Sequence, residues 1–117
     1  LKLRDIEVHW EKPSSEKWQS ALYLEDIQGL ELDGFSGRPA TAQFPAVVLN
    51  QVEDATIRNT KVEPGTTVFL DVKGEKTRGI GLIGNDFRKA KTPYQTTSGA
   101  KNTEVAAVNN LSRQPVQ

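Results

Sequence analysis

Three oxygen-bearing side chains lie at matching positions behind short apolar runs of the sequence. Glu25 follows LYL, Asn50 follows VVL and Asp71 follows VFL. If these runs are strands of neighbouring coils, their oxygens lie about 5 Å apart and could share a calcium ion or hydrogen-bond a sugar hydroxyl. Because a calcium ion needs about six to eight oxygen ligands, an exposed polar ladder is the simpler explanation. The sequence therefore predicts no metal site.

Aromatic side chains offer a second kind of chemistry, because an exposed ring can stack on a pyranose. Tyr23 occupies the same place in its run as Val48 and Phe69, which predicts an apolar column on an outer face. The alternative to a binding surface is that the segment from Trp10 to Ser20 or the C-terminal tail covers this column. Trp10 and Trp18 border a polar segment, where they either anchor a loop or form the rim of a groove. The candidate substrate-binding residues are Trp10, Trp18 and Tyr23.

The remaining reactive residue types do not complete a site. His9 is the single histidine of the sequence, and it has neither a second imidazole ligand nor an adjacent nucleophile to activate. Gly79, Gly81 and Gly84 form a loose glycine pattern, but the residues around them alternate as in a strand and no dinucleotide-binding unit surrounds them. The sequence predicts no catalytic residue within this chain and no cofactor.

A repeat positions these residues. Four similar segments begin at Leu1, Leu30, Ala55 and Ile80, so that they are spaced by 29, 25 and 25 residues. A period in this range is typical of a solenoid. The third residues of the segments predict one inward apolar column, made of Leu3, Leu32, Ile57 and Leu82. The fifth residues are types that tolerate a left-handed backbone, which predicts a corner of the chain at Asp5, Gly34, Asn59 and Gly84.

Each period contains further strands. The runs that begin at Leu22, Val47 and Val68 form a second register, which precedes the first, with Ile27 and Val52 filling the bend between them. Arg4, Asp33 and Arg58 form an outward ladder of alternating charge, which supports the register. A third short face begins after the corner and carries Ile6, Phe35, Val8 and Val62. The prediction is an all-β, parallel β-helix of about four coils.

The insertions and the ends of the repeat define the domain organisation. The segments from Trp10 to Ser20 and from Arg38 to Pro45 interrupt the period and are expected to loop out. Residues 1–91 are expected to form the coils, and residues 92–117 a linker with a terminal strand or cap. Leu1 begins in the middle of a coil, so we expect further coils of the same protein upstream, as the partner of this end.

The composition excludes several classes of partner. The 117 residues carry 15 Lys or Arg and 15 Asp or Glu, which leaves no basic footprint for nucleic acid or an anionic membrane. No run approaches the roughly 18 apolar residues of a membrane span, and the first residues lack the apolar centre of a signal peptide. Absence of cysteine excludes disulfides and thiolate chemistry. We predict binding neither to nucleic acid nor to a membrane.

The stretches SALYLEDIQGLELDGFSGRP and PAVVLNQVEDATIRNTKV resemble the late coils of right-handed parallel β-helix enzymes that act on polysaccharides. The sequence is most similar to bacterial members of glycoside hydrolase family 28, the polygalacturonases and rhamnogalacturonan hydrolases, over about residues 1–91. The resemblance implies an inverting hydrolase, in which one carboxylic acid protonates the leaving oxygen and a carboxylate activates water. It also implies a galacturonan or rhamnogalacturonan partner and a periplasmic or extracellular location.

The catalytic motifs of that family do not occur in this chain. They read Asn-Thr-Asp, Asp-Asp, Gly-His-Gly and Arg-Ile-Lys, whereas the nearest strings here are NTK from Asn59, ED from Glu25, ED from Glu53 and the isolated His9. The resemblance therefore places the catalytic acids upstream of Leu1, and we expect the parent protein, and not this segment alone, to be the enzyme. The segment would then stabilise the end of the helix and shape one rim of the groove. Two other functions remain open: a non-catalytic carbohydrate-binding or surface-spike β-helix, and a pectate lyase-like enzyme that uses calcium.

Overall fold

The computed structural model describes residues 1–10 and 19–112, and nearly all of its regular structure is β-strand. The strands are β1 (Lys2–Arg4), β2 (Glu7–Val8), β3 (Leu22–Asp33), β4 (Ser36–Gly37), β5 (Val47–Arg58), β6 (Lys61–Val62), β7 (Thr66–Lys73), β8 (Arg78–Ile83), β9 (Asp86–Phe87), β10 (Ala90–Thr97), β11 (Val105–Val108) and β12 (Leu111–Ser112). A 3-10 helix covers Asn102–Glu104. No helix within the described ranges is long and apolar enough to cross a membrane.

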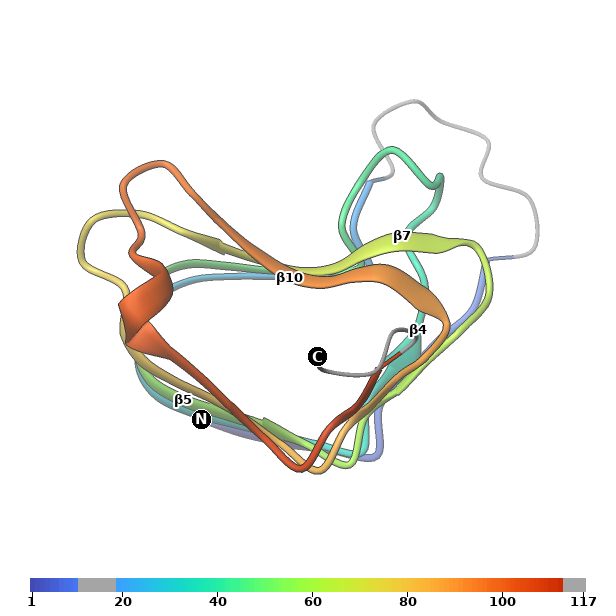
Figure 1. Ribbon diagram of the computed structural model, residues 1–117, viewed down its shortest axis with the longest axis horizontal. Helices are drawn as coiled ribbons and strands as arrows, with labels where there is room; N and C mark the ends of the chain where they lie inside the picture. Colours follow the sequence, from blue (N-terminus) through green and yellow to red (C-terminus); the bar gives the residue numbers. More distant parts are fainter. Residues whose placement is uncertain (11–18, 113–117) are drawn as a thin grey trace.

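Parallel pairing between successive coils builds a β-solenoid of about four turns, as the sequence predicted. One sheet has the order β1-β3-β5-β7-β10, with β8 between β5 and β11, and the second has the order β12-β9-β6-β4-β2. All pairs among the described strands are parallel. Figure 1 looks along the stack and shows the coils superposed around a common interior, with walls that contain β7 and β10, β5, and β4.

The predicted corner occurs in every coil. Backbone φ angles are positive at Asp5 (51°), Gly34 (79°), Asn59 (54°) and Gly84 (65°), and the column continues at Asn109 (55°). Aspartate, asparagine and glycine are the residues that reach this region at least cost, so the sequence locally specifies where the chain turns. Two residues past the corner the chain enters the second sheet, in which β2, β4 and β6 pair in series. We call this sheet the third wall of the solenoid.

Two further corners bend the long strands β3 and β5. Positive φ angles recur at equivalent positions of successive coils, first at Asp26, Gln51, Gly74 and Ser98, and then at Gly29, Asp54 and Gly79. The side chain of one coil lies over the glycine of the next. A Cβ atom added at Gly79 would lie 2.8 Å from Oδ1 of Asp54, and one added at Gly34 would lie 2.8 Å from Oδ1 of Asp5. At these two positions a larger residue would be strained by the positive φ and would also displace the aspartate side chain of the previous coil.

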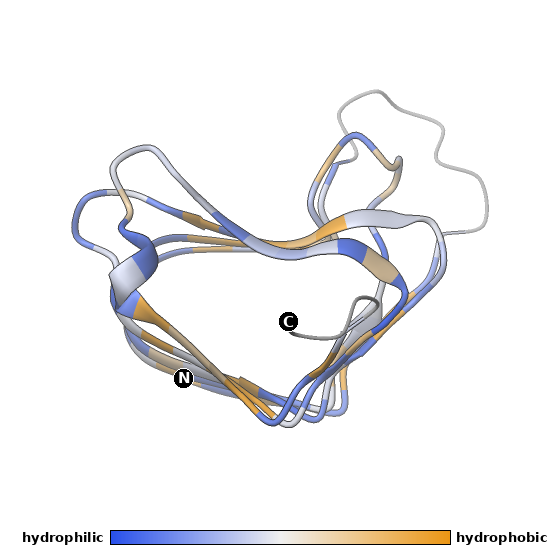
Figure 2. Cartoon of the chain, in the orientation of Figure 1, coloured by the Kyte–Doolittle hydropathy of each residue, from blue (hydrophilic) through white to orange (hydrophobic). Residues whose placement is uncertain are grey.

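The interior is the predicted apolar column. Leu3 pairs with Leu32, Leu32 with Ile57 and Ile57 with Leu82, and the last three of these side chains are fully buried. Figure 2 shows the apolar residues of successive coils superposed along the wall that contains β5. Because each inward side chain is buried by its neighbours above and below, the hydrophobic stabilisation of about 1.5–3 kcal/mol per Leu or Ile depends on stacking.

The first wall is formed by the first halves of β3 and β5 together with β7 and β10. Its register departs from the prediction by two residues. Val47 pairs with Leu22 as expected, but its partner in β7 is Leu70 and not Val68. The chain compensates for this shift between β7 and β8, where it makes a turn two residues longer than the bend inside β5. A shift by an even number of residues does not exchange the two faces of a sheet, so the apolar pattern does not reveal it.

Phe69 corrects the predicted outward column of Tyr23, Val48 and Phe69. Its side chain is fully buried, with its ring centroid 6.2 Å from that of Phe35 and 5.4 Å from that of Phe87. The residue paired with Val48 in β7 is Asp71. Consecutive burial at Phe69 and the following residue shows that strict alternation fails in β7, and the three rings fill the interior instead.

The described part of the segment 92–117 continues the stack. Thr92 pairs with Val68 and Tyr94 with Leu70, so residues that we predicted as a linker lie in strand β10. β11 and β12 then pair with β8 and β9. The polar residues of β10 are held in the stack by backbone hydrogen bonds to β7 of the previous coil. Hydrophobic periodicity does not reveal such a strand. The division of the chain at residue 91 stays a prediction.

Candidate functional site

A groove on the outer face of the first wall contains one of the three candidate residues. It has a volume of about 350 Å³ and is lined by Gln19, Ser20, Tyr23, Phe44, Pro45, Val48, Asp71 and Lys73. We call it the Tyr23 groove. Its floor comes from β3, β5 and β7, one strand from each of three coils, and one side comes from the segment between β4 and β5.

Hydrogen bonds within its own strand and with the next coil hold Tyr23 in place, while 54% of its surface stays exposed. Its hydroxyl donates to Oε1 of Glu25 at 3.2 Å and accepts from Nδ2 of Asn50 at 3.0 Å. The same Nδ2 donates to Oε1 of Glu25 at 2.8 Å. The phenol is therefore fixed by two neighbouring coils, and a fixed, exposed aromatic side chain is suited to binding at low entropic cost.

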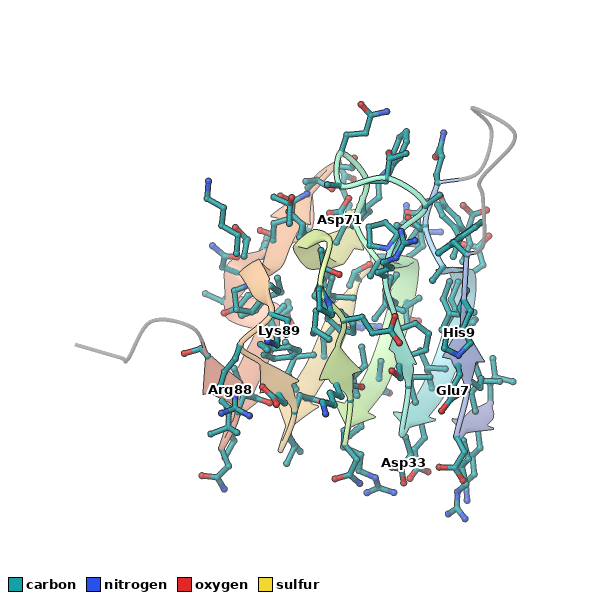
Figure 3. The ribbon with its side chains drawn as sticks, turned by 90° about the vertical axis from the view of Figure 1, so that its right-hand side faces the viewer. Glu7, His9, Asp33, Asp71, Arg88 and Lys89 are labelled. Carbon is teal, nitrogen blue, oxygen red and sulfur yellow. The ribbon has the colours of Figure 1, made fainter. Side chains whose placement is uncertain are left out.

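Asp71 and Lys73 supply the charged end of the groove. Asp71 is 7% exposed, and its Oδ1 accepts a hydrogen bond from the Thr97 hydroxyl at 2.8 Å. Lys73 is half-buried and has no ion-pair partner within the described residues. Figure 3 shows Asp71 well separated from His9 and Arg88, which directly follow β2 and β9 of the second sheet. The groove thus combines an aromatic side chain with a hydrogen-bond acceptor and a cation.

The segment between β4 and β5 covers part of the outer apolar column. Phe44 and Pro45 line the groove beside Val48, and Val48 is only 4% exposed although its side chain leaves the sheet on the outer face. The column is therefore covered at Val48, but by the Arg38–Pro45 insertion, whereas the sequence pointed to the Trp10–Ser20 segment or the C-terminal tail as the cover. Tyr23 is the member of the column that stays open.

Trp10 lies outside the Tyr23 groove. Its indole Nε1 donates to the carbonyl oxygen of Arg38 at 2.8 Å, and the side chain is half-buried. This bond ties the end of the first described segment to the start of the insertion between β4 and β5, which is an anchoring role. Trp18, the remaining candidate, lies outside the described residues.

The predicted oxygen ladder is only partly assembled. Glu25 pairs with Asn50 as expected, but Asn50 pairs with Lys73, so Asp71 lies in the neighbouring column. The two-residue shift of β7 causes this change. Throughout the described ranges, no group of three or more His, Cys, Asp or Glu side chains is arranged to hold a metal ion.

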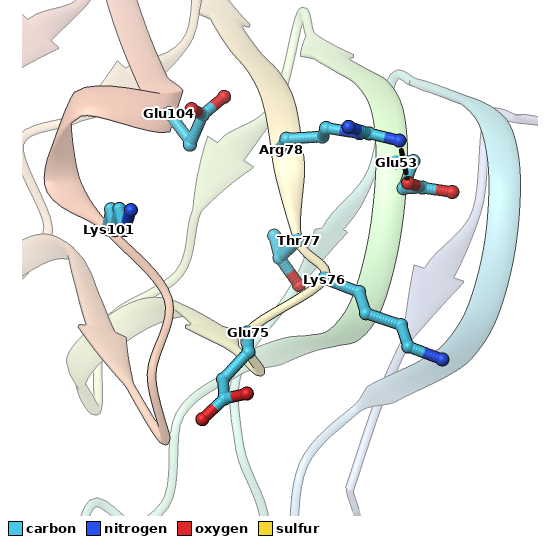
Figure 4. A pocket seen from close by; sticks show the side chains of 7 residues that line it. All are labelled: Glu53, Glu75, Lys76, Thr77, Arg78, Lys101 and Glu104. Carbon is cyan, nitrogen blue, oxygen red and sulfur yellow. Dashed lines mark ion pairs between the residues drawn. The ribbon is translucent and has the colours of Figure 1, made fainter.

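A second pocket, of about 290 Å³, lies at the wider turn between β7 and β8 (Figure 4). Its lining residues are Glu53, Glu75, Lys76, Thr77, Arg78, Lys101 and Glu104. Nη2 of Arg78 pairs with Oε1 of Glu53 at 2.7 Å, and Glu104 accepts from the backbone N–H of Gly79 at 3.2 Å. Sequence reasoning missed this pocket because the extra residues that widen the turn become visible only once the strands are paired.

Comparison with known proteins adds no relative. No protein-family model matches the chain, and neither a curated protein nor a solved structure gives a match. The fold and the geometry of the Tyr23 groove therefore carry the functional argument.

Proposed function

We propose that this solenoid binds a polysaccharide in the Tyr23 groove. The observation that carries the proposal is the half-exposed phenol of Tyr23, fixed by Glu25 and Asn50 at the edge of a groove that crosses three coils. A sugar ring has apolar C–H faces and a rim of hydroxyl groups. An aromatic side chain beside carboxylate and amide groups complements both features.

The pectin-directed form of this proposal depends on charge. Lys73 places an ammonium group in the groove, where it can pair with the carboxylate of a uronic acid. Together with the resemblance to glycoside hydrolase family 28, this supports a galacturonan or rhamnogalacturonan ligand and a periplasmic or extracellular setting. In a hydrolase of that type, the catalytic acids would lie outside residues 1–117, and this segment would form part of the substrate groove.

Affinity electrophoresis in gels that contain polygalacturonate or a neutral glucan tests the binding. Tyr23→Ala should lower the affinity about tenfold or more, which corresponds to about 1.4 kcal/mol, because the variant removes the ring. Tyr23→Phe keeps the ring and should retain most of the affinity. Ile83→Ala is the matched control, because Ile83 is an exposed apolar residue (45%) outside the groove.

Three outcomes would count against the proposal. Equal retardation of the wild-type chain and Tyr23→Ala in both polymers would remove the groove as the binding site. A loss of binding in Lys73→Ala for the neutral glucan as large as for polygalacturonate would remove the uronic acid from the proposal. Release of reducing ends from polygalacturonate by the isolated chain would contradict the placement of the acids outside this segment.

A further inference from the structure

The second pocket, which we call the turn pocket, owes its shape to one turn that widens from coil to coil. Counted between residues that pair with one another, this turn takes four residues (51–54) in the second coil, six (74–79) in the third and seven (98–104) in the fourth. The turns that follow β7 and β10 therefore reach beyond those of the earlier coils, as Figure 1 shows. The step between the narrow and the wide turns leaves a hollow of about 290 Å³ on the outer surface.

Hydrogen bonds to the previous coil hold the backbone of the turn pocket. The N–H of Lys76 donates to Oε1 of Gln51 at 2.9 Å. The Thr77 hydroxyl accepts from the N–H of Val52 at 3.2 Å and donates to the carbonyl oxygen of Lys73 at 2.6 Å. A ligand therefore meets a backbone that is already ordered, so little conformational entropy is lost when it binds.

The turn of the fourth coil forms another side of the pocket. Oε1 of Glu104 accepts from the N–H of Gly79 at 3.2 Å, which joins the two wide turns. Gly99 has a φ of +91°, and a Cβ atom added there would clash with Cγ of Glu75. The side chain of Glu75 therefore lies against the backbone of the following coil. Figure 4 shows that charged side chains from both turns surround Thr77.

The charges of the turn pocket are balanced in number but only partly paired. Six of its seven lining residues are charged, three of each sign. Arg78 and Glu53 form an ion pair at 2.7 Å and so neutralise one another. Among the residues that the structure describes, Glu75, Lys76 and Lys101 have no ion-pair partner, although all three line the same pocket. The pocket therefore presents two ammonium groups and one carboxylate to a ligand.

We propose that the turn pocket binds a small zwitterion, a molecule with one carboxylate and one ammonium group, such as a free amino acid. The ligand carboxylate pairs with Lys76 and Lys101, and its ammonium group pairs with Glu75. A ligand of a single sign meets at least one group of its own sign, which opposes its binding. The volume lies below that of pockets for drug-sized ligands, so it matches a ligand as small as an amino acid. The turn pocket shares no residue with the Tyr23 groove and does not depend on polysaccharide binding.

Matched probes separate the effect of charge from the effect of size. The zwitterions are glycine, 4-aminobutanoate and 6-aminohexanoate, which differ in the separation of their charges. For the tightest of them, the controls are the acid that lacks the amine and the amine that lacks the carboxyl group. NMR titration of the chain follows the backbone amide signals of Lys76, Thr77 and Lys101. The zwitterion should shift these signals and bind about tenfold or more tightly than either control.

Two variants test the roles of the two signs of charge. Glu75→Gln should raise the Kd of the zwitterion about tenfold or more without weakening the acid that lacks the amine. The double variant Lys76→Gln with Lys101→Gln should weaken the zwitterion and not the amine. Lys89→Gln with Lys91→Gln is the matched control, because both lysines are exposed, lie outside the pocket and change the net charge equally.

Three results would overturn the proposal. The first is that none of the three zwitterions shifts the signals of the turn. The second is that the acid alone binds as tightly as the zwitterion, because the ligand would then be a simple anion. The third is an equal loss of binding in the two double lysine variants, which would mean that only the overall charge of the chain attracts the ligand.

Discussion

Asn85→Ala is expected to cause a large loss of stability, because Asn85 connects three coils at the first corner. The side chain is 2% exposed. Its Oδ1 accepts from the backbone N–H of Thr60 at 3.0 Å, and its Nδ2 donates to the carbonyl of Ile57 at 2.9 Å and to Oδ1 of Asn110 at 3.0 Å. Alanine cannot replace any of these bonds.

The magnitude follows from the groups that the substitution leaves without a partner. The N–H of Thr60 and the carbonyl of Ile57 belong to buried residues, and each buried polar group that loses its partner costs about 1–3 kcal/mol. The two together predict a loss of about 2–6 kcal/mol in the free energy of unfolding. Since small domains are stable by only about 5–15 kcal/mol, this loss is a large share of the total.

Asn110→Ala is the matched control for this prediction. Asn110 repeats the same contacts one coil further on: its Nδ2 donates to the carbonyl of Leu82 at 2.8 Å and its Oδ1 accepts from the N–H of Asn85 at 2.9 Å. It is half-buried, so water can replace part of what is lost. Urea denaturation followed by circular dichroism measures both variants. A loss below about 1 kcal/mol in Asn85→Ala, or equal losses in both variants, would refute this account of the corner.

Three further predictions concern single positions. The Thr60 hydroxyl is the buried side-chain polar atom without a hydrogen-bond partner among the described residues, so Thr60→Val should leave the urea midpoint unchanged or raise it. Gly79→Ala should lower the free energy of unfolding by about 1–2 kcal/mol, because φ is +68° and the new Cβ would meet Asp54. The side-chain hydrogen bond from Arg88 lowers the pKa of Asp86 to about 2, so this contribution to stability is present above about pH 4 and is lost as the pH falls toward 2. Arg88→Ala should return the pKa of Asp86 toward 3.8 in an NMR titration, and an unchanged value would contradict the assignment.

The corners show how far local sequence can specify this fold. Asp5, Gly34, Asn59 and Gly84 were predicted as left-handed from residue type and spacing, and all four have positive φ. The corners inside β3 and β5 include Gln51, whose residue type gives no such signal. There the backbone turns because the neighbouring coils on both sides turn, which is a property of the stack and not of the residue.

The candidate site shows where sequence reasoning fails. Tyr23 was identified as outward-facing from its position in an alternating run, and it is exposed. The partners that define its groove were not identifiable, since Asp71 and Lys73 enter it through a two-residue shift of β7 that leaves the apolar pattern intact. Its use as a binding residue stays a prediction.

The sequence by itself determined the period, the inward column of Leu32, Ile57 and Leu82, and the main corner, because burial and left-handed backbone both restrict residue type locally. Only the tertiary structure decided the register of β7, the burial of Phe69 and the extra coil that begins with β10. These depend on backbone hydrogen bonds between coils. Such bonds have the same chemistry at every residue, so the side-chain pattern does not record which partner they choose.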